Sequence, residues 1–266
     1  MSAVGEQDAN PVQIHLALPK GHMQENVFKL FEDAGMKVTM GHTRGYRPTI
    51  PLRAYDVKLL KPQNILGMLA TGVRDVGFAG GDWVQELGLG ASGIVEVMDT
   101  ELDPVRIVAA APDPAILAKG GLGGRQLIVA SEYENLAKAW LATKGVAYTF
   151  LRAYGATESL PPEDADIIVD NAATGSTLKA NNLEVFDTLM RSTTRLYASQ
   201  AAWANPAKRA RIERLAMLLK AVLDARKRLM LTFNVAADKV DSMVAFLSKF
   251  ACVPRGVGGG GRAARA

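Results

Sequence analysis

Short apolar runs alternate along most of the chain with segments of helical spacing. The first apolar run, residues 12–18, precedes a segment in which Val27, Leu30 and Phe31 fall on one helical face and Gly35 marks the end. Four later stretches repeat this pattern of strand, turn and helix: "YDVKLLKPQNILGMLATG", "VRDVGFAGGDWVQELGLG", "RQLIVASEYENLAKAWLATKG" and "ADIIVDNAATGSTLKANNLEVFD". Further strands are predicted in "VRIVAAAP", "VAYTFLRAYG" and "TRLYASQAAW", and a long helix over 206–229.

Strands that alternate with helices of this length indicate βα units and largely parallel sheets, so the predicted fold class is α/β. The number of units favours two lobes with a cleft between them, although one doubly wound sheet also fits the pattern. Ligands of such sheets bind at the carboxyl ends of the strands. Several glycine-rich polar clusters fall there: "PKGH", "KP", "AGGD", "YGATES" and "DNAATGST".

Composition narrows the class of protein. The 266 residues are 48% hydrophobic and 22% charged, which is ordinary for a globular protein, and no apolar run is long enough to span a bilayer. The first residues lack the basic flank and apolar stretch of a secretory signal, so a cytoplasmic location is expected. A single cysteine, Cys252, excludes an internal disulfide framework and a cysteine-cluster metal site.

The formal charge of +4 is unevenly distributed. From Arg226 to the end there are eight Lys or Arg and two Asp or Glu, so the rest of the chain is slightly acidic. A nucleic-acid-binding domain carries a basic surface over its body, and this chain does not. The charge pattern therefore predicts no nucleic-acid partner.

The turn from Asp170 to Thr177 is the clearest candidate for a binding site. A strand ends at Asp170, and small and hydroxyl residues lead into a helix whose first amide groups have no intrahelical acceptor. Gly175 allows close approach of the backbone, so a phosphate group fits this position. A plain capped turn uses the same residue types, and both interpretations stay open on spacing alone. The pattern has neither the lysine of a P-loop nor the spacing of a dinucleotide fingerprint.

The segment "DNAATGSTLKANNL" closely resembles the phosphoribosyl-diphosphate loop of ATP phosphoribosyltransferases, D-x-x-x-T-G-x-T-L-x-A-N-G-L. Four other segments resemble motifs of that family in the same order. They are "LALPKG", "LLKPQNI…GVRDVGFAGGD" (L-x-R-P-x-D-I and G-x-x-D-x-G-I-x-G-x-D), "VRIVAAAP" (C-R-L-x-x-A-x-P) and "IVASEYENLAKAWLATKGV" (V-A-T-x-Y-P-N-L). The resemblance covers residues 12–230.

This resemblance implies a two-lobed catalytic part similar to type II periplasmic binding proteins. It implies a glycosyltransferase that joins N1 of ATP to the anomeric carbon of phosphoribosyl diphosphate and releases pyrophosphate, the first step of histidine biosynthesis. Mg²⁺ would arrive with the substrate phosphates, and a homo-oligomer is expected. The reaction needs no protein nucleophile. The alternatives are a non-catalytic two-lobed module that binds an anion, and a regulatory subunit.

The resemblance also implies roles for individual residues. The backbone of residues 173–177, with the hydroxyl groups of Thr174 and Thr177, would hold the 5′-phosphate. Asp170 would accept hydrogen bonds from the ribose or brace the loop. The family often has an acidic residue where Ala173 stands. The full set of expected substrate-binding residues is Gly21, Asp82, Arg106, Glu158, Asp170, Ala173, Thr174, Gly175, Ser176 and Thr177.

Three cations are candidates for stabilising the charge of the leaving group: Lys20, Lys61 and Arg53. Lys61 stands where the family usually has arginine, so it keeps the charge and loses the bidentate fork. Asp82 could contact the nucleotide, although capping of its helix is the simpler expectation. The histidines show no metal-binding or catalytic spacing, and "MDTELD" (98–103) is expected to be a solvated loop.

The expected domain organisation follows from these motifs. Residues 12–108 with 191–225 form the first lobe and 109–190 the second, which carries the phosphate loop. Residues 226–250 resemble the first strand and helix of a ferredoxin-like regulatory domain, and 251–266 are expected to be a disordered tail. Because one strand and one helix do not make a stable sheet domain, histidine is doubtful as an inhibitor.

Overall fold

The computed structural model describes residues 12–42, 45–90, 93–117, 125–229, 232–249 and 264–265. The chain divides into two compact units, Met1–Lys220 and Ala221–Ala266. The predicted end of the first lobe at 225 and this division both fall within one long helix, α7 (Pro206–Arg226).

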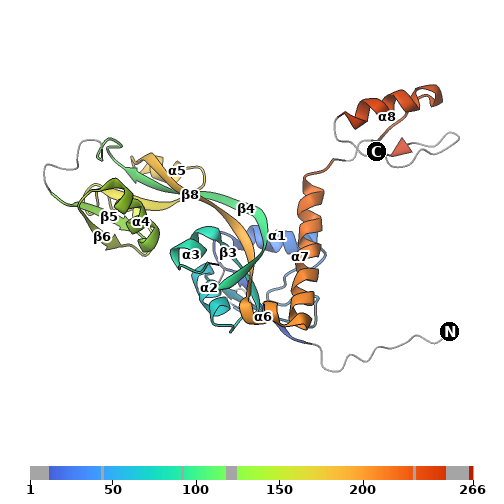
Figure 1. Cartoon of the computed structure of the whole chain (residues 1–266), viewed down its shortest axis with the longest axis horizontal. Helices are drawn as coiled ribbons and strands as arrows, with labels where there is room; N and C mark the ends of the chain where they lie inside the picture. Colours follow the sequence, from blue (N-terminus) through green and yellow to red (C-terminus); the bar gives the residue numbers. More distant parts are fainter. Residues whose placement is uncertain are drawn as a thin grey trace. The chain divides into compact units, whose positions relative to one another are not determined.

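An eight-stranded sheet runs through the first unit in the order β2-β1-β3-β8-β4-β7-β5-β6 (Figure 1). The strands are β1 (Ile14–Pro19), β2 (Tyr55–Leu60), β3 (Val76–Gly80), β4 (Ile94–Ala111), β5 (Leu127–Ser131), β6 (Tyr148–Arg152), β7 (Ile167–Ala172) and β8 (Glu184–Ser199). Strands β1 to β3 are parallel to one another, as are β5 to β7. The long strands β4 and β8 are antiparallel to each other and to their outer neighbours. The expectation of parallel pairing is therefore confirmed for the two outer groups and wrong at the centre.

The helices of this unit follow the predicted strands. They are α1 (Gln24–Asp33), α2 (Pro62–Ala70), α3 (Gly81–Glu86), α4 (Glu134–Lys144), α5 (Ser176–Ala180), α6 (Gln200–Ala204) and α7, with a 3-10 turn, η1 (Thr157–Ser159). Val27, Leu30 and Phe31 are buried on α1, as their spacing predicts. The helix after the phosphate loop is only five residues long.

Apolar side chains divide the sheet into two halves. One buried cluster joins α2 to β1, β3 and β8 through residues that include Ile65, Leu66 and Tyr197. In the other half, alternate residues of β4 point to opposite faces, so Ile107 and Val108 belong to different clusters. Both halves therefore have their own core, and β4 and β8 pass through both (Figure 1). The predicted lobe boundaries at 108–109 and 190–191 cut these two strands and stay a prediction.

The segment "MDTELD", expected to be a solvated loop, lies within β4. The pairing of β4 with β8 shifts register on both sides of Leu102, and Glu101 and Asp103 have φ values of 58° and 48°. Asp103 is buried, and its carboxylate accepts hydrogen bonds from Asn26 and from Thr194 Oγ1 (2.7 Å). The expectation was wrong because these bulges break the alternation of polar and apolar residues by which a strand is recognised.

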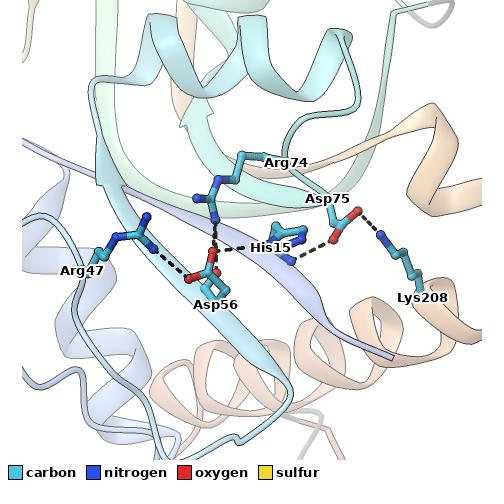
Figure 2. Close-up of polar contacts among 6 residues, drawn as sticks. All are labelled: His15, Arg47, Asp56, Arg74, Asp75 and Lys208. Carbon is cyan, nitrogen blue, oxygen red and sulfur yellow. Dashed lines mark hydrogen bonds and ion pairs between the residues drawn. The ribbon is translucent and has the colours of Figure 1, made fainter. Parts of the chain in front are cut away.

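A cluster of charged side chains lies at the amino ends of β1 to β3, at the opposite end of these strands from Pro19 and Leu60. Figure 2 shows its members: His15, Arg47, Asp56, Arg74, Asp75 and Lys208. Asp56 accepts hydrogen bonds from Arg74 (2.9 Å) and is 3.2 Å from His15 Nδ1. Burial is the largest influence on the pKa of Asp56 and raises it, but the combined effect of His15 and the arginines lowers that pKa below its ordinary value. Asp75 accepts from the His15 backbone amide (2.8 Å) and from Lys208 of α7 (2.7 Å). The cluster thus fixes the start of α7 to the sheet.

The second unit contains the end of α7, a short strand β9 (Thr232–Phe233), the turn η2 (Ala237–Lys239) and helix α8 (Val240–Ser248). The strand and helix expected within 226–250 are present. The expectation of a disordered tail over 251–266 lies outside the described residues, except at β10 (Ala264–Arg265), which pairs antiparallel with β9.

Candidate active site

Two adjoining hollows lie in the first unit, near the carboxyl ends of the parallel strands. The first, of about 240 Å³, is lined by residues of both halves, among them Lys20, Lys61 and Tyr133. The second, of about 440 Å³, is lined by the loops 155–158 and 170–178. Four residues line both hollows: His22, Val105, Glu132 and Asn171. The two hollows therefore form one continuous cleft, at the edge where the sequence places it.

The loop after β7 presents free backbone donors to the second hollow. Gly175 has a φ of 78° and caps α5, a conformation that favours glycine. In the described part of the chain, the amides of Ala173, Thr174, Gly175 and Thr177 donate to no acceptor. The side chains of Thr174, Ser176 and Thr177 are exposed. These four amides can thus bind an anion without losing a protein contact, whereas the Thr174 hydroxyl donates to Ser176 Oγ (3.1 Å) and would exchange that partner for the anion.

Asp170, the fourth residue of β7, is half-buried and lines the second hollow. Burial raises the pKa of its carboxyl group to about 6, and the nearby negative charges of Glu158 and Glu132 act in the same direction. The amide of Asn171 donates to Asp170 Oδ1 (2.6 Å) and partly opposes this rise. The group is therefore an acceptor at neutral pH that gains a proton in mild acid.

The first hollow has two lysines on one wall. Lys20 follows β1, and its Nζ lies 4.5 Å from the centre of the Tyr46 ring and 3.3 Å from the Tyr46 hydroxyl. Lys61 is the residue immediately before α2. Both side chains are exposed, so their charges can meet an anionic ligand at small desolvation cost.

Asp82 lines the same hollow but does not cap its helix, contrary to the simpler expectation. Gly80 occupies the N-cap of α3, and Asp82 lies in the first turn with its side chain buried. Its carboxylate accepts hydrogen bonds from Ser192 Oγ (2.6 Å) and the Tyr133 hydroxyl (2.7 Å). Burial, together with the charge of Asp82, raises the pKa of Tyr133 well above its ordinary value. A Cβ atom at position 80 would collide with the Asp82 carboxylate, which explains the glycine there.

Three expected site residues do not line either hollow of this cleft. Arg53 lies before the amino end of β2, whereas the cleft lies near the carboxyl ends of the strands. The six residues of β2 span about 20 Å, so Arg53 is far from the cleft. Val105 of β4 lines both hollows, and Arg106 is the next residue of that strand. Because successive strand residues point to opposite faces, the Arg106 side chain is expected to point away from the cleft. Gly21 has a φ of 96° at the turn after β1 and lines a separate surface hollow beside α1. The other expected residues, Lys20, Lys61, Asp82, Glu158 and Asp170 with 173–177, are brought together.

The cleft also contains residues to which no site role was assigned from the sequence: His22, Met23, Gln63, Trp83, Asp103, Glu132, Tyr133, Asn171, Ser192 and Thr193. Glu132 and Tyr133 directly follow β5, so the strand-end rule could have found them. Ser192 and Thr193 lie inside the long strand β8, and no local signal marks them as cleft residues.

Among the described residues, no group of three or more His, Cys, Asp or Glu side chains could hold a metal ion. Over the same ranges, no helix has the length and apolar character needed to cross a membrane.

The continuous sheet with two cores and a shared cleft defines a two-lobed α/β protein of the type II periplasmic-binding-protein class. In agreement, the fold is similar to the alkanesulfonate-binding protein SsuA from Xanthomonas axonopodis pv. citri bound to MOPS. The TM-score is 0.51 at 12% identity, over 90% of this chain and 81% of that chain.

The family HisG, ATP phosphoribosyltransferase, matches residues 61–221. ATP phosphoribosyltransferase of Pelotomaculum thermopropionicum is 37% identical over 242 residues, 89% of this chain and 82% of the relative. That of Desulforudis audaxviator is 36% identical over the same shares of each chain. The chain belongs to the ATP phosphoribosyltransferase family.

A solved structure agrees with this membership at the level of the fold. The ATP phosphoribosyl transferase (HisG:HisZ) complex from Thermotoga maritima matches 80% of this chain and 100% of that chain, with a TM-score of 0.67 and 23% identity. The chain is therefore an enzyme, a transferase of the first step of histidine biosynthesis. Family membership favours this function over a non-catalytic anion-binding module or a regulatory subunit.

Proposed function

We propose that the two hollows hold the two substrates of the reaction, with phosphoribosyl diphosphate in the second and ATP in the first. The single observation that carries this proposal is the set of four amides that line the second hollow and donate to no acceptor among the described residues, those of Ala173, Thr174, Gly175 and Thr177. These donors can bind the 5′-phosphate, and the hydroxyl groups of Thr174 and Thr177 add further donors. Asp170 accepts hydrogen bonds from the ribose hydroxyl groups.

ATP occupies the first hollow, where Lys20 and Lys61 offer positive charge to its phosphates. His22 and Asn171 line both hollows, so the adenine ring and the ribose can meet where the hollows join. N1 of the adenine forms a bond to the anomeric carbon as the bond to diphosphate breaks, and the leaving group takes the electron pair. Holding both substrates in this geometry supplies up to about 7–11 kcal/mol of the barrier in ideal cases.

The lining of the second hollow supports the proposal that a cation accompanies the substrate. Three of its lining residues are carboxylates, Glu132, Glu158 and Asp170, and none of its described lining residues is Lys or Arg. Mg²⁺ binds through substrate phosphates and one or two carboxylates, so this donor set fits it. When bound, the ion would neutralise part of the diphosphate charge. The lysines of the first hollow add positive charge from the other side of the cleft.

Two broader expectations belong to the same proposal. A cytoplasmic location suits a biosynthetic enzyme that uses ATP. An oligomer of this chain is also proposed; the solved Thermotoga maritima relative is a HisG:HisZ complex, which supports assembly with other chains and does not specify copies of one chain.

An assay with protein, ATP, phosphoribosyl diphosphate and Mg²⁺ tests the proposal, with phosphoribosyl-ATP followed by ultraviolet absorbance. Product formation is expected in the complete mixture and not when Mg²⁺ is chelated. The Lys20→Ala and Lys61→Ala variants are expected to raise the KM for ATP by about tenfold each, because an exposed charge contact to phosphate contributes about 1.4 kcal/mol. Saturable binding of both substrates without product would support the anion-binding module instead.

A further inference from the structure

Helix α3 belongs to the first half of the sheet, since it follows β3, yet its side chains reach the second half. The Trp83 ring packs against Tyr133 with 4.7 Å between ring centres, and the Tyr133 hydroxyl donates to Asp82. Trp83 also packs against the apolar clusters of both halves. A single short helix therefore connects both walls of the cleft.

Glu86, the last residue of α3, makes the most unusual of these contacts. Its carboxylate accepts hydrogen bonds from the amides of Asn135 (3.1 Å) and Leu136 (3.0 Å), which are in the first turn of α4. The Asn135 side chain donates in return to the Glu86 carbonyl oxygen (2.7 Å). Helix α4 has no cap of its own, because Tyr133 at its N-cap makes no side-chain cap hydrogen bond. A residue of one half thus caps a helix of the other.

This contact resists separation of the two halves. Glu86 is only 3% exposed, and among the described residues its carboxylate accepts hydrogen bonds from the amides of Asn135 and Leu136. Its charge is compensated by the amide donors and the positive end of the α4 dipole. Moving α4 away from α3 would leave a buried carboxylate unpaired and a helix start uncapped, and both changes are unfavourable.

We propose that Glu86 is a positioning residue for the transfer: by capping α4 from α3, it sets the distance between the lysine wall and the phosphate loop. Together, Asp82, Trp83 and Glu86 with Tyr133, Asn135 and Leu136 form what we call the α3–α4 clasp. The clasp lies beside the first hollow through Asp82, Trp83 and Tyr133, whereas Glu86 itself does not line it. This inference rests on the proposed placement of the two substrates in the two hollows.

The role predicts a particular kinetic pattern. Both halves line the first hollow, but the side chains proposed to hold ATP, Lys20 and Lys61, lie in the first half, and the phosphate loop lies in the second. The affinity for each single substrate should therefore change little when the clasp loosens. The attack of N1 on the anomeric carbon depends on the relation between the halves, and an error of about 1 Å in such geometry costs about a hundredfold in rate. Turnover should therefore fall far more than single-substrate binding.

The test uses the full chain with Glu86→Ala, Glu86→Gln and Glu134→Ala. Glu134 lies in the same first turn of α4 and pairs with Lys138 and Arg152 within the second half, so its removal is the matched control. We expect kcat to fall ten- to a hundredfold in Glu86→Ala. The Kd of phosphoribosyl diphosphate alone and of ATP alone, measured by calorimetry, should stay within about twofold. Glu86→Gln keeps only one of the two acceptor oxygens, so its kcat should lie between that of Glu86→Ala and that of the unaltered enzyme. Glu134→Ala should have the kcat of the unaltered enzyme.

Unchanged kcat in Glu86→Ala, or a Gln variant as slow as the Ala variant, would overturn the inference. Loss of both single-substrate affinities in proportion to kcat would also overturn it, because Glu86 would then serve folding alone. If Glu86→Ala does not fold, Asn135→Ala removes the reciprocal bond alone and should lower kcat two- to fivefold with both Kd values unchanged. Absence of turnover in the unaltered enzyme would refute the proposed function itself, and the two failures are thus distinguishable.

Discussion

The partly buried carboxyl group of Asp170 lowers the stability of the protein at neutral pH. Its pKa is raised from 3.8 to about 6, so the folded protein binds its proton more tightly than the unfolded chain does. The stability contributed by this group is therefore greatest below pH 4, declines as the pH rises to about 6, and stays low above that. An ionised carboxylate in this position disfavours folding at neutral pH. It is retained, on our proposal, to accept the ribose hydroxyl groups.

Asp170→Asn is expected to make the protein more stable and less active. At pH 7 the free energy of unfolding should rise by about 1–3 kcal/mol, because the unfavourable ionisation is removed. The gain should vanish by pH 4. In the same variant kcat/KM should fall by about a hundredfold, and in the unaltered enzyme kcat/KM should decline as the pH falls through 6. Urea unfolding at both pH values and steady-state kinetics measure these effects.

The exposed neighbour Asp164 provides the control, since Asp164→Asn should change neither quantity. An Asp170→Asn enzyme that is equally stable at pH 7, or fully active, would contradict the role assigned to Asp170.

Individual residues were predictable where the signal was local. The strand-end positions of Lys20, Lys61 and the loop 173–177 follow from βα patterning, and the structure places them at the cleft. Asp170 also lines the cleft, but the strand expected to end there continues to Ala172. Asp82 follows a strand and looks like a cap, but its partners Tyr133 and Ser192 are distant in the chain. Pairings across the cleft have no local pattern, and sequence reasoning missed them for that reason.

At the scale of elements, the predictions succeed for the βα units and fail for the two central strands. Helices α1, α2 and α4 and strands β1 to β3 and β5 to β7 follow from apolar spacing. Strands β4 and β8 were each predicted only in part, because bulges and polar residues interrupt their alternation. The two strands pair with each other along most of their lengths. The sequence of one segment alone does not reveal this pairing, so it does not predict how long each strand is.

Gly175, at the N-cap of α5, and Gly145, at the C-cap of α4, both have a left-handed backbone, which allows a matched comparison. Gly175 and Gly145 have φ values of 78° and 65°, and an added Cβ would contact no atom within 4 Å at either position. Each change to alanine should cost about 1 kcal/mol of stability through the left-handed backbone alone. Only Gly175→Ala should also raise the KM for phosphoribosyl diphosphate, by about tenfold, because it shifts the amides. Thermal unfolding and steady-state kinetics measure the two effects, and equal KM values in the two variants would argue against an amide cup.

At the scale of the whole first unit, the charged cluster at the amino ends of β1 to β3 lines neither hollow of the cleft, so we expect it to affect stability and not catalysis (Figure 2). Asp75 is 3% exposed and holds Lys208 and the His15 amide. Asp75→Ala should lower the free energy of unfolding by about 3 kcal/mol, since a cation and a buried amide lose their acceptor. The KM values of folded protein should not change. A large rise in either KM, with stability intact, would show that this cluster communicates with the cleft.

The central claim is that the amides of residues 173–177 bind the sugar phosphate and that the opposite half of the sheet presents the purine to it. A crystal structure of the protein with phosphoribosyl diphosphate and Mg²⁺ tests this most directly. We predict 5′-phosphate oxygens within hydrogen-bond distance of the amides of Ala173, Gly175 and Thr177, with the ribose hydroxyl groups at Asp170 and the diphosphate directed toward the first hollow. A phosphate bound elsewhere, with these amides facing solvent, would contradict the claim.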